Sequence, residues 1–170
     1  DLDPDKAVFR AGDAEEMPLP YGLSAVVSSS ALQWFERPER FLARSADALD
    51  EGGVIAIATF GVENMREIGS LSGVRLHYPS CEQLRRMIPS AMTLVHFSEQ
   101  IITLTFGSAR EVLTHLRQTG VSGIERPLGV TATRRLIADY DAGYSDGKGG
   151  VTLTYHPIYI VARKGTAERR

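Results

Sequence analysis

Apolar and polar residues along the chain form two kinds of pattern, one typical of buried strands and one of amphipathic helices. Continuous apolar runs over residues 23–28 and 54–60 predict strands that are buried on both faces. Between them, Pro38 stands at a favourable first-turn position, and apolar residues then recur on one helical face up to Leu49. We expect this helix to stop at residues 50–53, where a glycine can adopt a left-handed cap. The whole unit predicts two parallel strands joined by a right-handed helical crossover.

A shorter strand is expected ahead of this unit, at residues 7–10. It breaks into the polar and small residues 12–14, and the strand over 23–28 breaks in the same way into small polar residues and then into residues 32–34. Each segment has the form of a parallel strand whose carboxyl end opens into a crevice. Open α/β sheets bind their ligands at such ends.

The second half of the chain predicts short helices. One is expected around residues 63–71. Ser80 with Gln83, and Ser108 with Glu111, have the spacing of capping boxes at the starts of two more.

Long strands are expected to close the sheet. Residues 92–106 predict one long strand, or two strands joined near residues 98–99, and residues 151–162 predict a final strand. Pro157 inside the final strand implies an edge position or a bulge, because proline cannot donate to a β-ladder. A pair of long strands after parallel ones predicts an antiparallel hairpin at one edge of the sheet.

Composition narrows the class of protein. A chain of 170 residues with 43% hydrophobic and 24% charged residues is typical of one ordinary soluble domain. With a net charge of −2, nucleic acid is not expected as a partner, and no apolar stretch approaches the ~20 residues of a membrane span. Cys81 is the only cysteine, which fits a reducing compartment and hence a cytoplasmic protein. The start at Asp1 indicates a processed product or a fragment.

The residues after the first expected strand are candidates for adenine binding. Asp13, between Gly12 and Ala14, can accept a hydrogen bond from an adenine amino group, while the backbone N–H of Ala14 donates to a ring nitrogen. The alternative is that Asp13 only caps the turn that follows it, as aspartate often does after glycine.

The residues after the second strand are candidates for the wall of the same ligand site. Ser28 and its serine neighbours would let a ligand approach the backbone closely, although a polar turn explains them almost as well. Gln33 is a polar residue between the large apolar residues Leu32 and Trp34. Trp34 is the only tryptophan, and the alternative for it is packing in the core.

Other kinds of catalytic site find no support in the sequence. The four histidines, at His77, His96, His115 and His156, lie far apart and outside any metal-binding motif, so we expect no metal. A nucleophile elbow is absent, and the glycine-rich run 147–150 precedes a strand instead of a helix, unlike a phosphate-binding loop.

Taken in order, six segments resemble malonyl-acyl carrier protein O-methyltransferases of biotin synthesis, which are class I S-adenosylmethionine (SAM) methyltransferases. They cover residues 12–19, 28–34, 52–60, 60–68, 112–121 and 153–156. The Gly-Asp and Gly-Gly pieces are shared by many methyltransferases. Leu32-Gln33-Trp34 and the Leu-Thr-Tyr-His run at 153–156 are much more specific to this family.

The resemblance implies an α/β, Rossmann-like sheet with strand order 3-2-1-4-5-7-6, which lacks its first two strands here and keeps a C-terminal antiparallel pair. Residues 1–170 would be the C-terminal portion of a single methyltransferase domain, with the substrate-side cap within residues 60–150. The glycine-rich loop that holds the methionine end of SAM, and the acid that holds its ribose, belong to the missing part. We therefore expect the isolated chain to be inactive and to need its missing N-terminal half or a second copy.

The same resemblance implies methyl transfer from SAM to the free carboxylate of a malonyl thioester on acyl carrier protein. Gly12, Asp13, Ala14, Ser28, Leu32, Gln33 and Trp34 would then border the cofactor, with no residue acting as a catalytic acid or base. Tyr155, His156 and Arg117 are candidates for the malonyl end, and strand alternation points Tyr155 and His156 to opposite faces.

Two alternatives remain open. The chain could belong to a carboxyl methyltransferase of another small acid, such as one similar to trans-aconitate methyltransferases, which share the Gln-Trp feature. It could also be a non-catalytic half, either a subunit of a split enzyme or a degenerate interaction module.

Overall fold

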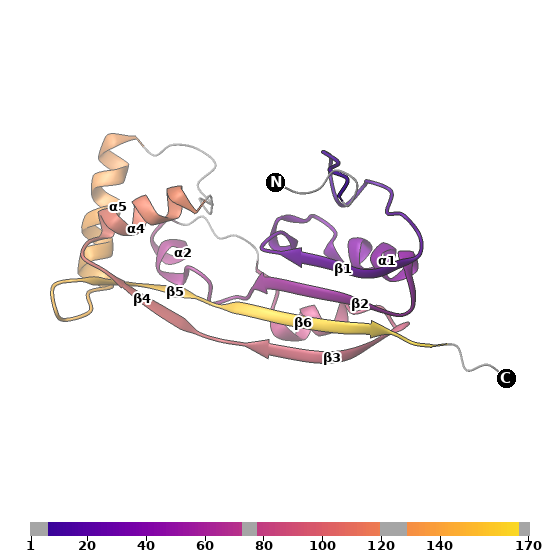
Figure 1. The fold of residues 1–170 in the computed structure, drawn as a ribbon. Helices are drawn as coiled ribbons and strands as arrows, with labels where there is room; N and C mark the ends of the chain where they lie inside the picture. The colour runs from indigo at the N-terminus through magenta and orange to yellow at the C-terminus, as the bar shows by residue number, and fades with distance from the viewer. Residues whose placement is uncertain (1–6, 73–77, 120–128, 167–170) are drawn as a thin grey trace.

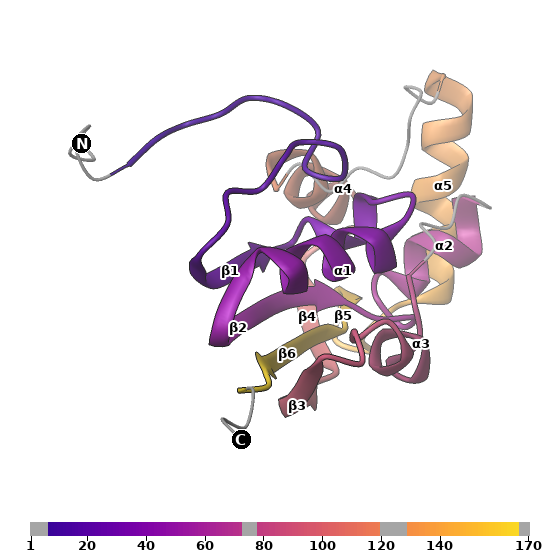
Figure 2. The same ribbon diagram turned by 90° about the vertical axis from the view of Figure 1, so that its right-hand side faces the viewer.

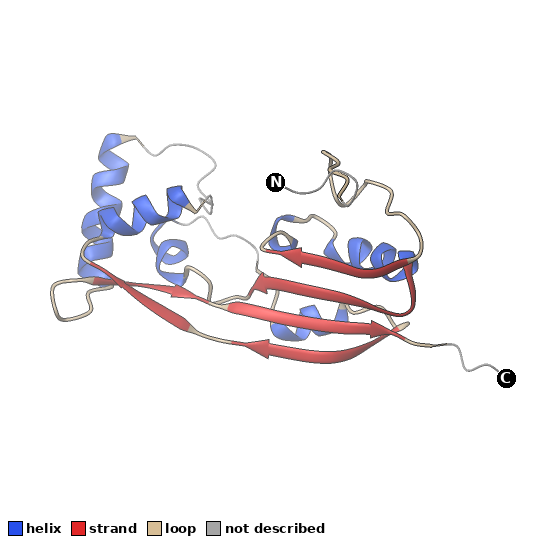
Figure 3. Cartoon of the chain, in the orientation of Figure 1, coloured by secondary structure: helices blue, strands red, loops and turns tan. Residues whose placement is uncertain are grey.

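The computed structural model describes residues 7–72, 78–119 and 129–166. Its main feature is a four-stranded sheet in the order β1-β2-β6-β3 (Figures 1 and 3). The strands are β1 (Leu23–Ser29), β2 (Leu49–Phe60), β6 (Pro157–Lys164) and β3 (Met92–Glu99). β1 and β2 are parallel, whereas β6 runs antiparallel to both of its neighbours. This order corresponds to the expected 4-5-7-6 part of the methyltransferase sheet, with the antiparallel pair at one edge.

A second, two-stranded sheet continues the long strands away from the first one. It pairs β4 (Ile102–Phe106) with β5 (Val151–Tyr155). Figure 1 shows β3 leading into β4 and β5 leading into β6, so the two sheets form one long ribbon. Three helices pack at the β4–β5 end: α2 (Arg66–Ser72), α4 (Ala109–Gln118) and α5 (Val130–Gly143). These helices together with β4 and β5 are called the cap below.

The main sheet is covered on one face by α1 (Pro38–Ala48) and α3 (Cys81–Arg86), which Figure 2 shows on the same side. Ile55 and Ile57 of β2 and Ile158 and Ile160 of β6 are buried on this face. A short 3-10 helix, η1 (Leu32–Trp34), adds Leu32 to the same core. No helix in the described residues is long and apolar enough to cross a membrane.

The prediction that both apolar strands are buried on both faces is wrong. Residues of β2 alternate between buried and half-buried, and in β1 Val27 is 74% exposed. The cause is that α1 and α3 cover one face only, and among the described residues β1 pairs with β2 alone. An apolar run shows that a segment can be buried, but not which of its faces has a neighbour.

The strand expected at residues 7–10 is not formed. These residues have no regular structure in the chain, and Val8 and Phe9 are about 80% exposed (81% and 80%). A strand needs a partner for its backbone N–H and C=O groups, and the described residues offer none at this position.

Two turn predictions also need correction. α1 ends at Ala48, and the left-handed glycine, Gly52 (φ 75°), lies inside β2, where the register with β1 shifts. Pro157 begins β6, which lies inside the sheet and not at its edge. The ladder breaks just before Pro157, because the N–H of His156 donates to Asn64 Oδ1 at 3.2 Å instead of to a strand.

The helix starts follow the sequence more closely. Pro38 stands at the first turn of α1, and Ser80 and Gln83 form a reciprocal capping box at α3. Ser108 caps α4 by accepting from the N–H of Glu111. Residues 92–106 form two strands, β3 and β4, joined just after residue 99, as the second of the two alternatives predicted. The last residues of the expected segment 112–121, and His77, lie outside the described residues.

Candidate functional site

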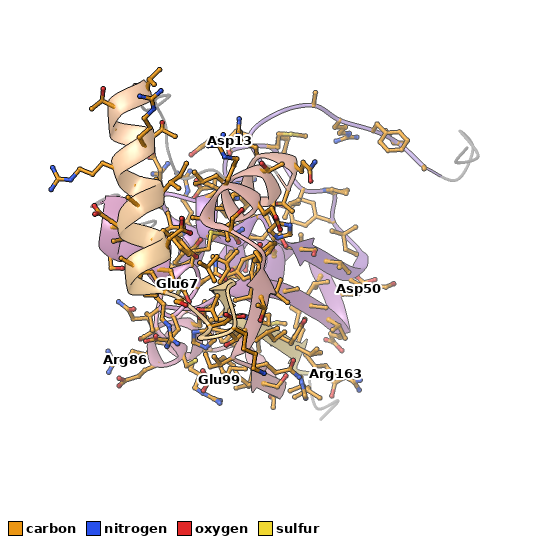
Figure 4. All side chains as sticks on the ribbon, turned by 90° about the vertical axis from the view of Figure 1, so that its left-hand side faces the viewer. Asp13, Asp50, Glu67, Arg86, Glu99 and Arg163 are labelled. Atoms are coloured by element: carbon orange, nitrogen blue, oxygen red, sulfur yellow. The ribbon has the colours of Figure 1, made fainter. Side chains whose placement is uncertain are left out.

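Residues 7–22, which precede β1, are called the N-terminal loop below, and an open hollow of about 490 Å³ lies between this loop and the start of α1. Its lining brings together residues 12–16 and 34–37, and so it joins the two segments that the sequence singled out. Asp13, labelled in Figure 4, lies on the upper edge of the molecule. Of the expected cofactor residues, Gly12, Asp13, Ala14 and Trp34 line this hollow.

The hollow depends on Glu15, a side chain that sequence reasoning missed. Glu15 is only 8% exposed, and its carboxylate accepts hydrogen bonds from the backbone N–H groups of Glu36 at 2.9 Å and Arg37 at 2.7 Å. Arg37 is the N-cap of α1 and Glu36 precedes it, so these N–H groups lie at the positive end of the helix dipole, where a carboxylate is stabilised. Glu15 therefore anchors the N-terminal loop on the start of α1.

Further contacts hold the same loop in place. The guanidinium of Arg44, on α1, donates to the backbone carbonyls of Glu15 and Met17. Glu16 forms ion pairs with Arg37 at 2.7 Å and Arg40 at 3.1 Å, with about half of the Glu16 side chain exposed (51%). The sequence alone does not show which of Glu15 and Glu16 is the buried anchor, because their difference in burial arises only from folding.

Asp13 caps its own turn. Its Oδ1 accepts from the N–H of Glu15 at 2.9 Å, and its backbone carbonyl accepts from the N–H of Met17 at 2.8 Å. Asp13 therefore does cap the turn, as the alternative interpretation predicted. The cap uses Oδ1 of Asp13, and the second carboxylate oxygen can accept further hydrogen bonds. The adenine role of Asp13 stays a prediction.

Gln33 joins the ends of the two parallel strands. Its Nε2 donates to the carbonyl of Ser30 at 2.8 Å, and its Oε1 accepts from Thr59 Oγ1, near the end of β2, at 3.2 Å. Trp34 is 47% exposed, so core packing does not account for it. Leu32, in contrast, is 2% exposed and belongs to the core, and Ser28 is half-buried on β1.

Tyr155, His156 and Arg117, which the sequence suggested for the substrate end, each contact different residues. Tyr155 Oη lies 2.8 Å from Nε2 of His115, a residue on α4 that the sequence did not single out. His156 is 4% exposed and contacts Glu99 of β3 instead. Arg117 is exposed, and its Nε donates to the carbonyl of Leu113 on its own helix at 3.3 Å. Only Tyr155 therefore faces the cap helix α4, consistent with the expected alternation.

A second polar cluster joins Cys81, Glu99 and His156, whose ligand-type atoms lie within 4.8 Å of one another. His156 Nδ1 accepts from the N–H of Glu63 at 3.2 Å, which assigns the proton to Nε2, and Nε2 donates to Glu99 Oε2 at 2.8 Å. The Cys81 thiol donates to the same oxygen at 3.0 Å. All three groups are satisfied within this network, so the arrangement fits a hydrogen-bonded cluster better than a metal site.

The network also sets the protonation of its members. Hydrogen bonds from Cys81 and then His156 hold the pKa of Glu99 below its usual value. Burial, together with the hydrogen bond to Glu99, raises the pKa of Cys81 to about 11. The thiol is therefore protonated at neutral pH. Figure 4 shows Asp13 and Glu99 at opposite edges of the molecule, so this cluster is separate from the hollow.

Comparison with known proteins gives a consistent picture. Residues 2–57 match a methyltransferase domain family. The chain is 42% identical over 161 residues to the malonyl-[acyl-carrier protein] O-methyltransferase of Bacteroides fragilis, covering 94% of this chain and 33% of that protein. It is 40% identical over 157 residues to the protein of the same name from Bacteroides helcogenes, covering 91% and 57%. The chain thus spans less than two thirds of the length of these relatives.

Solved structures show the fold. A methyltransferase-like protein from Bacillus halodurans superimposes with a TM-score of 0.66 at 15% identity, over 95% of this chain and 79% of that one. The YcgJ protein from Bacillus subtilis gives a TM-score of 0.61 at 12% identity, over 94% and 71%. The α/β methyltransferase fold that the sequence predicts is therefore confirmed, as is the resemblance on which that prediction rests.

Proposed function

Because this chain is similar over nearly its whole length to malonyl-[acyl-carrier protein] O-methyltransferases, we propose that it is part of an enzyme of that activity. The reaction is methyl transfer from SAM to the free carboxylate of a malonyl thioester on acyl carrier protein, a step of biotin synthesis. The observation that carries the proposal is the 42% identity over 94% of the chain. The sheet order and the position of the hollow support it.

The hollow would hold the adenine side of SAM. Asp13 offers a carboxylate oxygen to the amino group of adenine, and Ala14 offers a backbone N–H to the ring. Trp34 offers an exposed aromatic face in the same hollow. Gln33, fixed between Ser30 and Thr59, would border the methionine end. SAM, when bound, supplies a methyl group on a positively charged sulfur.

The chemistry asks little of the protein beyond placement. A carboxylate is ionised at neutral pH and is itself the nucleophile, so no general base is needed. One carboxylate oxygen forms the new O–CH₃ bond as the S–CH₃ bond breaks, and the thioether leaves without charge. The protein accelerates this reaction by aligning the two groups and keeping water away from them.

The uncovered parts of the sheet support the proposal that a longer protein completes the site. The outer edge of β1 pairs with no described strand, and Val27 beside it is 74% exposed. A sheet edge with unpaired backbone groups and apolar side chains recruits further strands. We propose that residues 1–170 are the C-terminal portion of one methyltransferase domain, with the cap as its substrate side. An N-terminal half, or failing that a second copy, would cover this edge.

The test uses the full-length protein that contains this chain, with SAM and malonyl-acyl carrier protein, and follows the methyl ester by mass spectrometry. Free malonate and trans-aconitate serve as competing acids. Methylation of the carrier-bound malonyl group supports the proposal. Methylation of a free acid alone favours the alternative carboxyl methyltransferase. No methyl transfer to any acid, with the protein folded and SAM bound, favours a non-catalytic subunit.

A separate measurement addresses the fragment. If the contacts to the methionine carboxylate and the ribose come from the N-terminal half, as we propose, the chain alone does without them, and hydrogen bonds to charged groups are worth about 1.5–3 kcal/mol each. Its affinity for SAM should be roughly a hundredfold weaker than that of the full-length protein, as measured by calorimetry. Equal affinities would show that residues 1–170 already form the complete cofactor site.

A further inference from the structure

Within the cap, a hydrogen-bonded pair of half-buried side chains connects helix α4 to the end of β5. His115 Nε2, on α4, lies 2.8 Å from Tyr155 Oη, and the two rings meet edge to face at 6.1 Å. Aromatic rings flank the pair: Phe106 lies 5.2 Å from the imidazole and Phe60 lies 6.2 Å from the phenol, measured between centroids. The pair is therefore fixed in orientation on two sides.

The position of this pair relates it to the proposed site. Phe60 is the last residue of β2 and directly follows Thr59, which donates to Gln33. Thr59 and Phe60 point to opposite faces of β2, but both lie at its carboxyl end, where Gln33 and Tyr155 each make one of these contacts. Figure 1 shows the carboxyl ends of β1 and β2 pointing toward the cap. The carboxyl ends of parallel strands are where ligands bind in this class of sheet.

The protons of the pair decide what it can offer a ligand. Burial raises the pKa of Tyr155, so its phenol keeps its proton at neutral pH. If Tyr155 donates to His115, its only O–H is used. If His115 donates its Nε2–H to Tyr155 Oη, the phenol O–H can donate elsewhere, either to the Thr119 hydroxyl that also hydrogen-bonds Tyr155 or to a ligand that takes its place. Nε2–H is one of the two tautomers of a neutral imidazole, and it is also present in the protonated form.

We propose that His115 is a positioning residue that donates to Tyr155, so that the Tyr155 O–H donates to the carboxylate of a malonyl-type acid. This inference rests on the proposed function. A hydrogen bond from a hydroxyl to a carboxylate is short and about twice as strong as one between neutral groups. The phenol is neutral, so it orients one carboxylate oxygen without pairing its charge, and the other oxygen stays nucleophilic.

The test is a double-mutant cycle in the full-length enzyme with Tyr155→Phe, His115→Phe and both together. Each single change should lower kcat/KM for malonyl-acyl carrier protein roughly tenfold to hundredfold, by removing a hydrogen bond to a charged group or its orientation. The double variant should be no worse than Tyr155→Phe, because His115 acts through Tyr155. His115→Gln, whose amide can replace the Nε2–H, should recover part of the activity.

Binding of SAM and a matched tyrosine provide the controls. The dissociation constant of SAM should not change in any variant. Tyr144→Phe, which removes a hydroxyl bonded to Ser70 just after the end of α5, should leave kcat/KM unaltered. Additive losses in the cycle, or losses that follow SAM affinity and melting temperature, would overturn the inference while leaving methyl transfer intact. A native enzyme that methylates no malonyl thioester would overturn the proposed function as well.

Discussion

Replacement of Glu15 by glutamine should release the N-terminal loop from α1. The native carboxylate accepts the backbone N–H groups of Glu36 and Arg37 from a site that is only 8% exposed. Glutamine has nearly the same size but keeps a single acceptor oxygen, and its NH₂ group would face one of these N–H donors. One charged hydrogen bond is lost and one buried donor is left without a partner.

The magnitude follows from these two bonds. Hydrogen bonds to charged groups contribute about 1.5–3 kcal/mol, which corresponds to a change of roughly tenfold to hundredfold in the ratio of docked to open loop. The effect should be local, because the main core lies around β2 and β6 and does not include the loop. We therefore expect the melting temperature to change little while the loop opens more often.

Two measurements report on the loop directly. Exchange of the amide hydrogens of Glu36 and Arg37 should accelerate by the same factor in Glu15→Gln. Trp34 is the only tryptophan and lines the hollow with the loop, so acrylamide should quench its fluorescence more strongly. Glu16→Gln is the matched control. Its ion pairs are about half-exposed, and such pairs contribute roughly 0–1 kcal/mol.

The anchoring role of Glu15 is refuted if amide exchange at residues 36 and 37 is equally slow in native protein and in Glu15→Gln. It also fails if Glu16→Gln opens the loop as much as Glu15→Gln does, since charge in the loop, and not the buried anchor, would then hold it. Equal quenching of Trp34 in all three proteins would lead to the same conclusion.

Three further predictions concern other parts of the chain. Asp13→Asn keeps an oxygen for the turn but removes the charge, so SAM affinity in the full-length protein should fall about tenfold by calorimetry; unchanged affinity with a lower melting temperature would leave Asp13 as a turn cap only. The pKa of Cys81 is raised to about 11, so the thiolate is scarce at pH 8 and alkylation by iodoacetamide should be slow there and accelerate up to about pH 11. Glu99→Gln removes the carboxylate that favours the thiol and should accelerate alkylation at pH 8, and an unchanged rate would contradict the network. Glu67→Gln should lower the free energy of unfolding by about 2–3 kcal/mol, measured by denaturation in urea. Glu67 is only 1% exposed, and its carboxylate accepts hydrogen bonds from the backbone N–H and the hydroxyl of Thr154 on β5. The exposed control Glu82→Gln should cost less than about 0.5 kcal/mol.

The elements that the sequence predicted well are those set by neighbours along the chain. Pro38 at the start of a helix and the reciprocal Ser80–Gln83 cap act within one turn, so their signals are complete in the local sequence. The expected strand at residues 7–10 failed for the opposite reason. Strand formation depends on a partner, and the pattern of one segment contains no information about whether that partner is present.

The candidate site divides in the same way. The turn at Asp13 and the end of β1 were readable because small and polar residues follow an apolar run. Glu15 and His115 were not, since each acts on residues distant in sequence: the first on the start of α1, the second on Tyr155. Their roles depend on contacts that form only when the chain folds, between the N-terminal loop and α1 and between α4 and β5.

The place of β6 in the sheet has a consequence for synthesis of the chain. The last strand of the described residues, β6, lies between β2 and β3, and it pairs residues as distant as Val54 and Arg163. During translation β3 therefore leaves the ribosome before its sheet partner exists. The edges of β2 and β3 that pair with β6 stay without a partner until residues 157–164 emerge. Contacts of such long range slow folding and expose edges that aggregate, so we expect the nascent chain to depend most on chaperones just before residues 157–164 emerge.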